Sequence, residues 1–382
     1  MASIVSSQSE HRDLSSPKEK GGDDGAGRRP RLVVREVSRG PILALVAAAL
    51  FGLSAPVAKI LLAHASPQLL AGLLYLGSGT GLGILWLIRG RSNREAPLSG
   101  KDLPWLAGAI TFGGALGPVL LMAGLARTPA SSASLLLNLE GVFTALIAWF
   151  VFRENFDRRI ALGMLAIVAG GVLLSWQGQV EWGSLAGPLL IAGAALCWAV
   201  DNNFTQKVSG RDPVQIAMLK GLAAGGINTG LAIALGARAP VPLSLAGALV
   251  LGFLSFGVSL VFFVLALRSL GSARTGAYFS SAPFVGAVAS LLLFREQPSA
   301  RFLAAAGLMA LGVWLHLSER HQHEHTHKPI EHEHMHVHDE HHQHAHTAED
   351  PPGEPHSHPH RHERLTHTHV HYPDIHHRHA HD

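Results

Sequence analysis

The sequence predicts an all-α polytopic membrane protein with ten transmembrane helices, built as two inverted five-helix repeats. Three observations lead to this prediction. Residues 41–317 hold only 17 Lys or Arg and 9 Asp or Glu, which is 26 charges in 277 positions. The Lys and Arg residues of this block gather in alternate loops. The second half of the block also echoes the first half at a nearly constant spacing.

The low charge density decides the class of protein. About a quarter of the residues in a soluble domain are charged, because its surface must be hydrated. This block must therefore lie in lipid. We predict four parts: a disordered cytoplasmic N-terminus at 1–40, repeats at 41–178 and 182–317, and a disordered His-rich cytoplasmic tail at 318–382. The single cysteine, Cys197, excludes a disulfide framework and a multi-thiolate metal site.

Apolar runs set the number of spans, since a membrane-crossing helix needs about 20 apolar residues. Glu140 alone interrupts one run and Lys220 alone interrupts another. Merging the runs predicts ten helices near 41–62, 69–88, 105–125, 131–151, 160–177, 185–205, 214–236, 245–267, 275–294 and 302–317.

The loops between these spans alternate in positive charge. Loops on one side hold eleven Lys or Arg, and loops on the other side hold four. Cytoplasmic loops carry the excess of positive charge, so the richer side and both termini are predicted to lie in the cytoplasm. We expect a multi-pass protein of a bacterial inner membrane.

An internal repeat relates the two halves. Residues 124–154 match residues 266–296, so that Phe152-Arg153-Glu154 corresponds to Phe294-Arg295-Glu296, and Pro67 similarly corresponds to Pro213. Each copy contains five helices. Because five is an odd number, the second copy must enter the membrane upside down. Inverted repeats of this kind are typical of secondary transporters, which hold their substrate near the midplane between the halves.

Around these repeats the sequence resembles the drug/metabolite transporter superfamily, of the EamA type. Members carry a Glu-Pro in the fourth helix and a Gly-Glu at its end. Here Leu139-Glu140-Gly141 keeps the Glu, Ala282-Pro283 keeps the Pro in the ninth helix, and Arg153-Glu154 and Arg295-Glu296 stand at the Gly-Glu positions. The resemblance covers 41–317. It implies proton- or gradient-driven transport, often export, of small organic solutes.

Few ionisable residues fall inside the predicted spans, and such residues usually face a cavity because a charge in lipid is costly. Glu140 lies close to the midplane, where it would carry a coupling proton or lock helices by pairing with Lys59 or Lys220. Asp201, Asn202 and Asn203 occupy most of one helical turn, so they either line a cavity or place Asp201 in headgroup water. We expect Lys59 and Lys220 to reach the membrane interface along their apolar stems.

Other candidates rest on position alone. Asn138, Trp198 and Tyr278 are predicted to line the cavity, with packing as the alternative. Glycine pairs at four-residue spacing, among them Gly221/Gly225 and Gly226/Gly230, predict close contacts between helices.

Residues 321–382 hold 23 of the 26 histidines. Neutral imidazole binds zinc, copper and nickel, so we predict loosely held, exchangeable metal sites on this tail. Protonation of the tail between neutrality and about pH 5.5 is an alternative role, as a pH sensor. Candidate metal ligands are His321, His323, His325, His327, His332, His334, His336, His338, His356, His358, His360, His362, His367, His369 and His371.

Two stretches of the tail, at 323–327 and 332–336, match the His-Glu-x-x-His pattern of metalloproteases. That motif needs a stable helix that presents both histidines to one zinc. Neither stretch has an apolar face, so we predict no protease activity and no enzyme.

We predict a secondary active transporter, an exporter, that moves small organic metabolites or drugs by alternating access. No cofactor is required, and the expected partners are a small-molecule solute and the lipid bilayer, with divalent metal ions on the tail and no nucleic acid. Two alternatives stay open: a divalent metal (Zn, Ni or Co) exporter whose tail captures the ion, and a membrane-anchored metal buffer.

Overall fold

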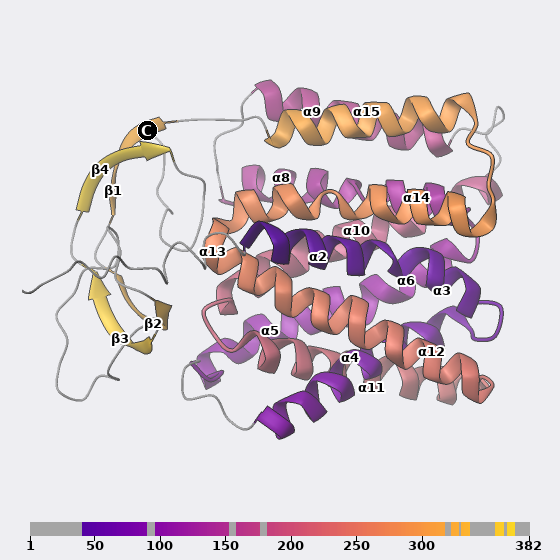
Figure 1. The fold of residues 1–382 in the computed structure, drawn as a ribbon, viewed down its shortest axis with the longest axis horizontal. Coiled ribbons are helices and arrows are strands. Elements are labelled where there is room, and N and C mark those ends of the chain that lie inside the picture. The colour runs from indigo at the N-terminus through magenta and orange to yellow at the C-terminus, as the bar shows by residue number, and fades with distance from the viewer. Residues whose placement is uncertain are drawn as a thin grey trace, which may run out of the picture.

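The computed structural model describes residues 40–89, 96–152, 158–175 and 182–317, together with four short segments of the tail. Every element between Gly40 and Leu317 is helical (Figure 1). These elements are α2 (Gly40–Gly52), α3 (Ser54–Leu61), α4 (Pro67–Arg89), the 3-10 helix η1 (Gly100–Asp102), α5 (Leu103–Ala109), the π-helix η2 (Ile110–Leu116), α6 (Gly117–Leu125), α7 (Ala130–Leu136), α8 (Leu139–Phe152), α9 (Arg158–Ser175), α10 (Trp182–Val208), α11 (Pro213–Ala234), α12 (Pro242–Gly252), the π-helix η3 (Phe253–Val258), α13 (Ser259–Phe279), α14 (Ala282–Phe294) and α15 (Ala300–Leu317).

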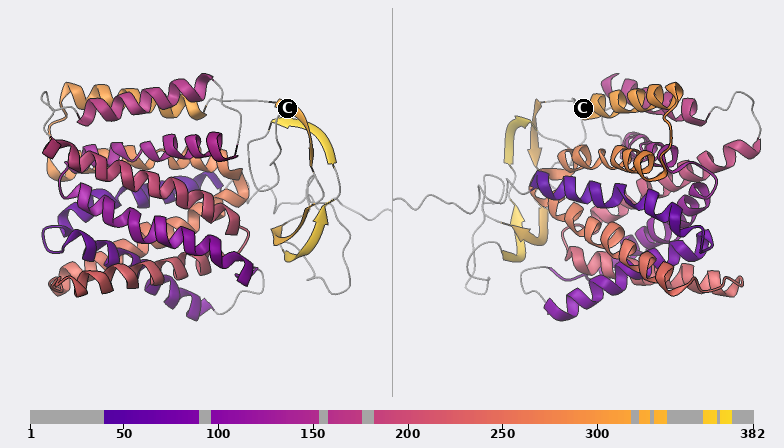
Figure 2. Two further views of the ribbon diagram at one scale, coloured as in Figure 1. Left: turned by 180° about the vertical axis from the view of Figure 1, so that it is seen from behind. Right: turned by 45° about the vertical axis from the view of Figure 1, so that its right-hand side comes forward.

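The helices form a bundle in which most axes run in roughly the same direction (Figures 1 and 2). Within the described residues, seven helical stretches are long and apolar enough to cross a membrane, and three further apolar helices are shorter. Large apolar side chains stay exposed on the outside of this bundle, as a lipid-facing surface requires. Examples are Ile42, Ile88, Leu165, Leu189, Ile233, Leu243, Leu292 and Trp314.

One loop that was predicted between two spans is a continuous helix in the structure. A loop was expected between spans ending at 267 and beginning at 275, whereas α13 continues from Ser259 to Phe279. The corresponding stretch of the first half is interrupted between α6 and α7, where Pro129 precedes the first residue of α7. Proline lacks the N–H that continues a helix. The repeat places Gly271 at the position of Pro129, so this obstacle is absent from α13.

Several elements of the two halves coincide when the registers of the sequence repeat are applied to them. The register that maps Phe152 onto Phe294 carries the bounds of α9 onto 300–317, which are the bounds of α15, and carries η2 onto 252–258, which overlaps η3. The register that maps Pro67 onto Pro213 carries the first residue of α4 onto the first residue of α11. The π-helices are uncommon elements, and their recurrence at equivalent positions indicates that both halves share one architecture.

Corresponding helices pack against each other and run in opposite directions. On α4 and α11, a Cβ added at Gly72 would meet Thr229, and one added at Gly79 would meet Leu222, so the residue numbers run in opposite senses along the contact. The pair α9 and α15 repeats this arrangement, because Gly170 lies against Ala305 whereas Gly312 lies against Gly163. This second pair forms one edge of the bundle (Figure 1).

Further contacts also join the two halves. α2 packs on α13, α6 packs on α10, and α7 packs on α14. Hydroxyl groups fix the first of these contacts, because Ser255 Oγ donates to the carbonyl of Leu50 at 2.7 Å and Ser259 Oγ donates to that of Ala47 at 2.8 Å. The main hydrophobic core draws on both halves, from Leu70 and Leu121 to Ile191 and Met309.

Four short strands occur in the tail: β1 (Gln322–His327), β2 (Ile330–His336), β3 (His356–His362) and β4 (Leu365–Val370). β1 pairs with β4 and β2 pairs with β3, both antiparallel, with His323 opposite His369 and His334 opposite His358. The alternation of His with other residues has the two-residue period of a strand. Disorder of the tail as a whole stays a prediction.

Candidate functional site

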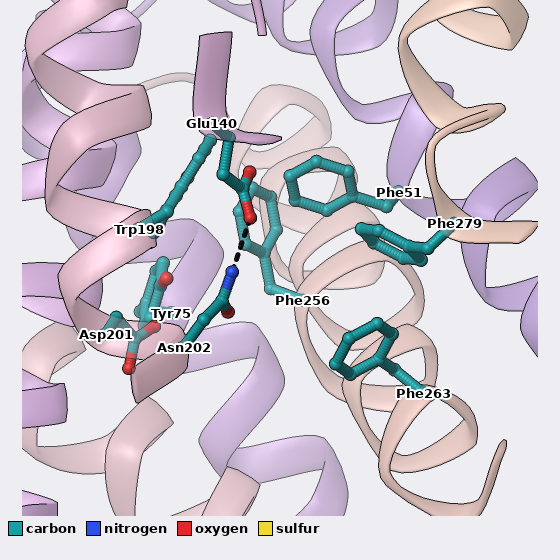
Figure 3. A pocket seen from close by; sticks show the side chains of 9 residues that line it. All are labelled: Phe51, Tyr75, Glu140, Trp198, Asp201, Asn202, Phe256, Phe263 and Phe279. Atoms are coloured by element: carbon teal, nitrogen blue, oxygen red, sulfur yellow. Dashed lines mark hydrogen bonds between the residues drawn. The ribbon is translucent and has the colours of Figure 1, made fainter. Parts of the chain in front are cut away.

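A cavity inside the helical bundle is lined by residues of both halves. The cavity volume is about 80 Å³, and the cavity opens partly toward solvent. Two carboxylates, one amide and six aromatic rings surround this space (Figure 3). The lining residues are Phe51, Tyr75, Glu140, Trp198, Asp201, Asn202, Phe256, Phe263 and Phe279.

Glu140 enters the cavity at a break between two helices. α7 ends at Leu136 and α8 begins at Leu139, so Glu140 stands in the first turn of α8. The Asn138 amide group stabilises the break, because its Nδ2 donates to the carbonyl of Leu135 at 2.9 Å. An equivalent break separates α13 and α14 at Ser280-Ser281. Interrupted helices at membrane depth occur where backbone lines a cavity.

α10 supplies the polar side of the cavity opposite Glu140. Trp198, Asp201 and Asn202 lie three and four residues apart, which places them on one face of this helix. The amide of Asn202 donates to Glu140 Oε1 with an Nδ2–Oε1 distance of 2.6 Å (Figure 3). The side chains of α8 and α10 are therefore joined through Glu140 without a cation.

Asp201 is neutralised by a buried lysine from α11. Lys220 Nζ forms an ion pair with Asp201 Oδ2, and Thr205 Oγ1 donates to Asp201 Oδ1 at 3.0 Å. The exposed fractions are 4% for Lys220 and 5% for Asp201, so both charges depend on each other for solvation.

The π-helix η2 brings its backbone against this ion pair. A Cβ added at Gly113 would lie 1.9 Å from Asp201 Oδ2, so only glycine allows this approach. The Gly113 carbonyl accepts hydrogen bonds from Tyr75 OH at 2.7 Å and Trp198 Nε1 at 3.0 Å. Both aromatic side chains of this contact therefore direct their polar atoms away from the open cavity.

Aromatic rings enclose the rest of the space. Phe51 lies at the centre of the cluster, with ring centroids 5.5 Å from Trp198 and Phe279 and 5.8 Å from Phe256. Phe256 in turn lies 5.3 Å from Tyr75. The rings come from α2, α4, α10, η3 and α13, so both halves contribute to the lining.

The structure brings four of the predicted site residues to this cavity: Glu140, Trp198, Asp201 and Asn202. Lys220 lies directly behind Asp201, so the prediction that Lys220 reaches the interface is wrong. Of the two alternatives for Asp201, the structure has the cavity lining and not headgroup water. The two side chains pair inside the bundle, because each removes the cost of burying the other.

Other predicted residues lie elsewhere. Asn203 donates to the carbonyl of Ala199 on its own helix at 2.8 Å, and Tyr278 is 36% exposed and does not line the cavity. Asn138 also stays outside the lining and supports the helix break. Lys59 donates to the carbonyls of Leu125 and Thr128, so it caps the end of α6 and does not pair with Glu140. Its access to the membrane interface stays a prediction.

Of the two glycine pairs named above, one makes the predicted close contact between helices. Gly221 and Gly225 pack against the backbone of α4, whereas nothing lies within 4 Å of a Cβ added at Gly226 or Gly230. The second pair therefore makes no helix contact among the described residues.

Metal ligands do not gather within the described part of the helical block. No group of three or more His, Cys, Asp or Glu residues is placed there to hold an ion. Of the candidate metal ligands on the tail, His321, His338 and His371 lie outside the described residues. Metal binding by the tail stays a prediction.

The comparison with protein families identifies both halves. The model of the EamA-like transporter family matches residues 38–176 and again residues 185–318. The chain belongs to the EamA-like transporter family. Its helical block is therefore that of a multi-pass membrane transporter.

Individual relatives of this EamA-like chain are also transporters. An uncharacterised transporter from Methanothermobacter thermautotrophicus is 27% identical over 292 residues, which cover 72% of this chain and 85% of that protein. A probable amino-acid metabolite efflux pump from Salmonella typhimurium is 31% identical over 175 residues, 45% of this chain and 54% of the pump. A probable 4-amino-4-deoxy-L-arabinose-phosphoundecaprenol flippase subunit from Pseudomonas fluorescens is 46% identical over 70 residues, 18% of this chain and 58% of the subunit.

A crystal structure of another protein has the same fold. It aligns with the EamA-like chain at a TM-score of 0.56 and 19% sequence identity, over 72% of this chain and 94% of the other.

Proposed function

We propose that this EamA-like transporter is a secondary active exporter of small organic metabolites and that it works by alternating access. The observation that carries the proposal is the cavity itself, since residues of both halves line it and Glu140 enters it at a helix break. Secondary transporters bind substrate at such a place, between repeats and beside discontinuous helices. Movement of one half against the other would change which side of the membrane the cavity faces.

Ten spans in two inverted repeats form part of this proposal. The antiparallel contacts of α4 with α11 and of α9 with α15 support it, because corresponding helices of an inverted repeat must run in opposite directions. The recurrence of the π-helix and of the later helix break at equivalent positions supports it as well. We also propose a bacterial inner membrane and cytoplasmic termini, for which the alternating loop charges are the support.

Glu140 is the proposed coupling residue. Its carboxylate reaches the cavity, and its hydrogen bond to Asn202 joins α8 to α10 across the boundary between the halves. Loss or gain of a proton at Glu140 would change this contact and therefore the relative stability of the two halves' arrangements. Asp201 is less suited to this role because Lys220 already holds it in an ion pair.

Flux measurements test the proposal. Purified protein in liposomes should exchange a loaded organic solute in response to a proton gradient, and Glu140→Gln should abolish this coupled flux while the protein stays inserted. Glu296→Gln is the matched control, because Glu296 accepts a hydrogen bond from Ser131 outside the cavity. Undiminished coupled flux in Glu140→Gln would remove Glu140 from the mechanism. Absence of solute flux from liposomes that contain folded, inserted wild-type protein would reject the transport proposal.

A further inference from the structure

The cavity of the proposed transporter has a definite charge, which depends on one residue. Glu140 and Asp201 are its two acidic residues, and Lys220 neutralises Asp201. Among the described residues no lysine, arginine or histidine forms an ion pair with Glu140, whose partner is the neutral amide of Asn202. With Glu140 ionised, the lining therefore presents one uncompensated negative charge.

Most side-chain hydrogen-bond donors of the lining are occupied, and only the second N–H of the Asn202 amide stays available. Tyr75 OH and Trp198 Nε1 both donate to the Gly113 carbonyl, and Asn202 Nδ2 donates to Glu140. The Lys220 ammonium group is held by Asp201 and does not line the cavity. A carboxylate or phosphate in this space would lose its hydration in exchange for one neutral N–H of Asn202, which lies beside the Glu140 carboxylate, and such burial is unfavourable.

Six aromatic rings complete the lining, and like Glu140 they favour a positively charged solute. An aromatic face carries partial negative charge and attracts a cation within about 6 Å of its centre. Phe51, Phe256 and Phe279 form one cluster, with centroid separations of 5.5 and 5.8 Å from Phe51. A ring or branched alkyl group can pack among them while a charged nitrogen approaches Glu140.

We propose that the substrate is a monovalent organic cation, namely a protonated amine that bears an aromatic or branched apolar group and no free carboxylate. This inference rests on the proposed transport function and adds the charge class of the solute. It separates amines from amino acids, because the carboxylate of a zwitterion would find in the described lining only one neutral donor, on Asn202, next to the negative charge of Glu140. It also separates them from divalent metal ions, which require several oxygen or nitrogen ligands.

Equilibrium binding to the full-length purified protein tests this inference without any flux measurement. The probes share one ring and differ in charge: 2-phenylethylamine, L-phenylalanine, 3-phenylpropanoate and 2-phenylethanol. Calorimetry should find the amine bound at least about tenfold more tightly than each of the other three, a difference of about 1.4 kcal/mol. Glu140→Gln should weaken amine binding by about tenfold or more and leave the affinity for 2-phenylethanol unchanged. Glu296→Gln should bind all four probes with the affinities of the wild type.

A folded protein that binds the zwitterion or the anion as tightly as the amine, or that does not bind the amine, overturns the inference. Retained amine affinity in Glu140→Gln also overturns it. Flux in the same liposomes separates this failure from failure of the transport proposal. Coupled flux of 3-phenylpropanoate would support the transport proposal and reject the amine class. Tight amine binding without any flux would support the amine class and reject the transport proposal.

Discussion

Replacing Gly113 with alanine should disrupt the centre of the site. The added Cβ would lie 1.9 Å from Asp201 Oδ2 and 2.6 Å from Asp201 Cβ, whereas ordinary contact begins at 3.4 Å. Rotation of the carboxyl group cannot relieve the second contact, so η2 and α10 must separate. Overpacking of this kind costs about 1–3 kcal/mol. If Asp201 also leaves Lys220, the broken buried ion pair costs about 3–5 kcal/mol.

Thermal unfolding in detergent, followed by loss of the monodisperse peak on size exclusion, measures this effect. Gly113→Ala should unfold at a clearly lower temperature than the wild type and lose amine binding. Gly226→Ala is the matched control, because nothing lies within 4 Å of its added Cβ. If Gly113→Ala is as stable as Gly226→Ala and binds normally, the close approach of η2 to Asp201 is refuted.

Three further predictions follow from other contacts. Lys220→Met should destabilise the protein by about 3–5 kcal/mol in the same unfolding assay. Adding Asp201→Leu to this variant should recover most of the lost stability. Equal stability of the single and double variants would contradict the ion pair. Gly79→Ala should lower the stability of the protein by about 1–3 kcal/mol, because its Cβ would lie 2.4 Å from a backbone nitrogen of α11. Gly83→Ala should be tolerated, because its Cβ would lie 3.7 Å from a methionine sulfur. Equal melting temperatures of the two variants would contradict the α4–α11 contact. Deletion of 318–382 should leave organic-solute flux unchanged in liposomes, whereas weakened cation export at low metal, or loss of all activity, would favour the metal exporter or the metal buffer.

Much of the fold could be predicted from charge and periodicity. Apolar runs marked the helices of the block because a lipid-facing helix must be apolar along its length, and the internal repeat anticipated the correspondence of α9 with α15. The continuity of α13 through 268–274 was missed, because basic residues were taken to indicate a loop. The tail strands were missed because the prediction weighed composition and not the two-residue alternation of histidine.

The site was predictable in its polar residues and in Trp198, but not in its other aromatic residues. Glu140, Asp201 and Asn202 are rare residue types in lipid, so their positions alone suggested a cavity. Phe51, Tyr75, Phe256, Phe263 and Phe279 line it as well, yet phenylalanine is common in membrane helices and gives no comparable signal. The clearest missed sign was Gly113-Gly114, which permits the π-helix on which Tyr75 and Trp198 converge.

Lys220 shows why spacing along one helix was insufficient. Its position near the start of α11 suggested access to the membrane interface. Its partner, Asp201, lies on α10, and only the packing of α11 and α10 around η2 brings the two charges together. Pairing between helices depends on tertiary contacts that a single sequence does not specify.

Cysteine labelling measures the inverted arrangement of the two halves most directly. Arg158 and Ala300 are exposed, begin α9 and α15, and correspond to each other in the internal repeat. In a Cys197→Ala background, Arg158→Cys and Ala300→Cys should react with a membrane-impermeant maleimide from opposite sides of sealed vesicles, with Arg158→Cys protected in intact cells. Labelling of both positions from the same side would contradict the inverted repeat on which the proposed mechanism depends.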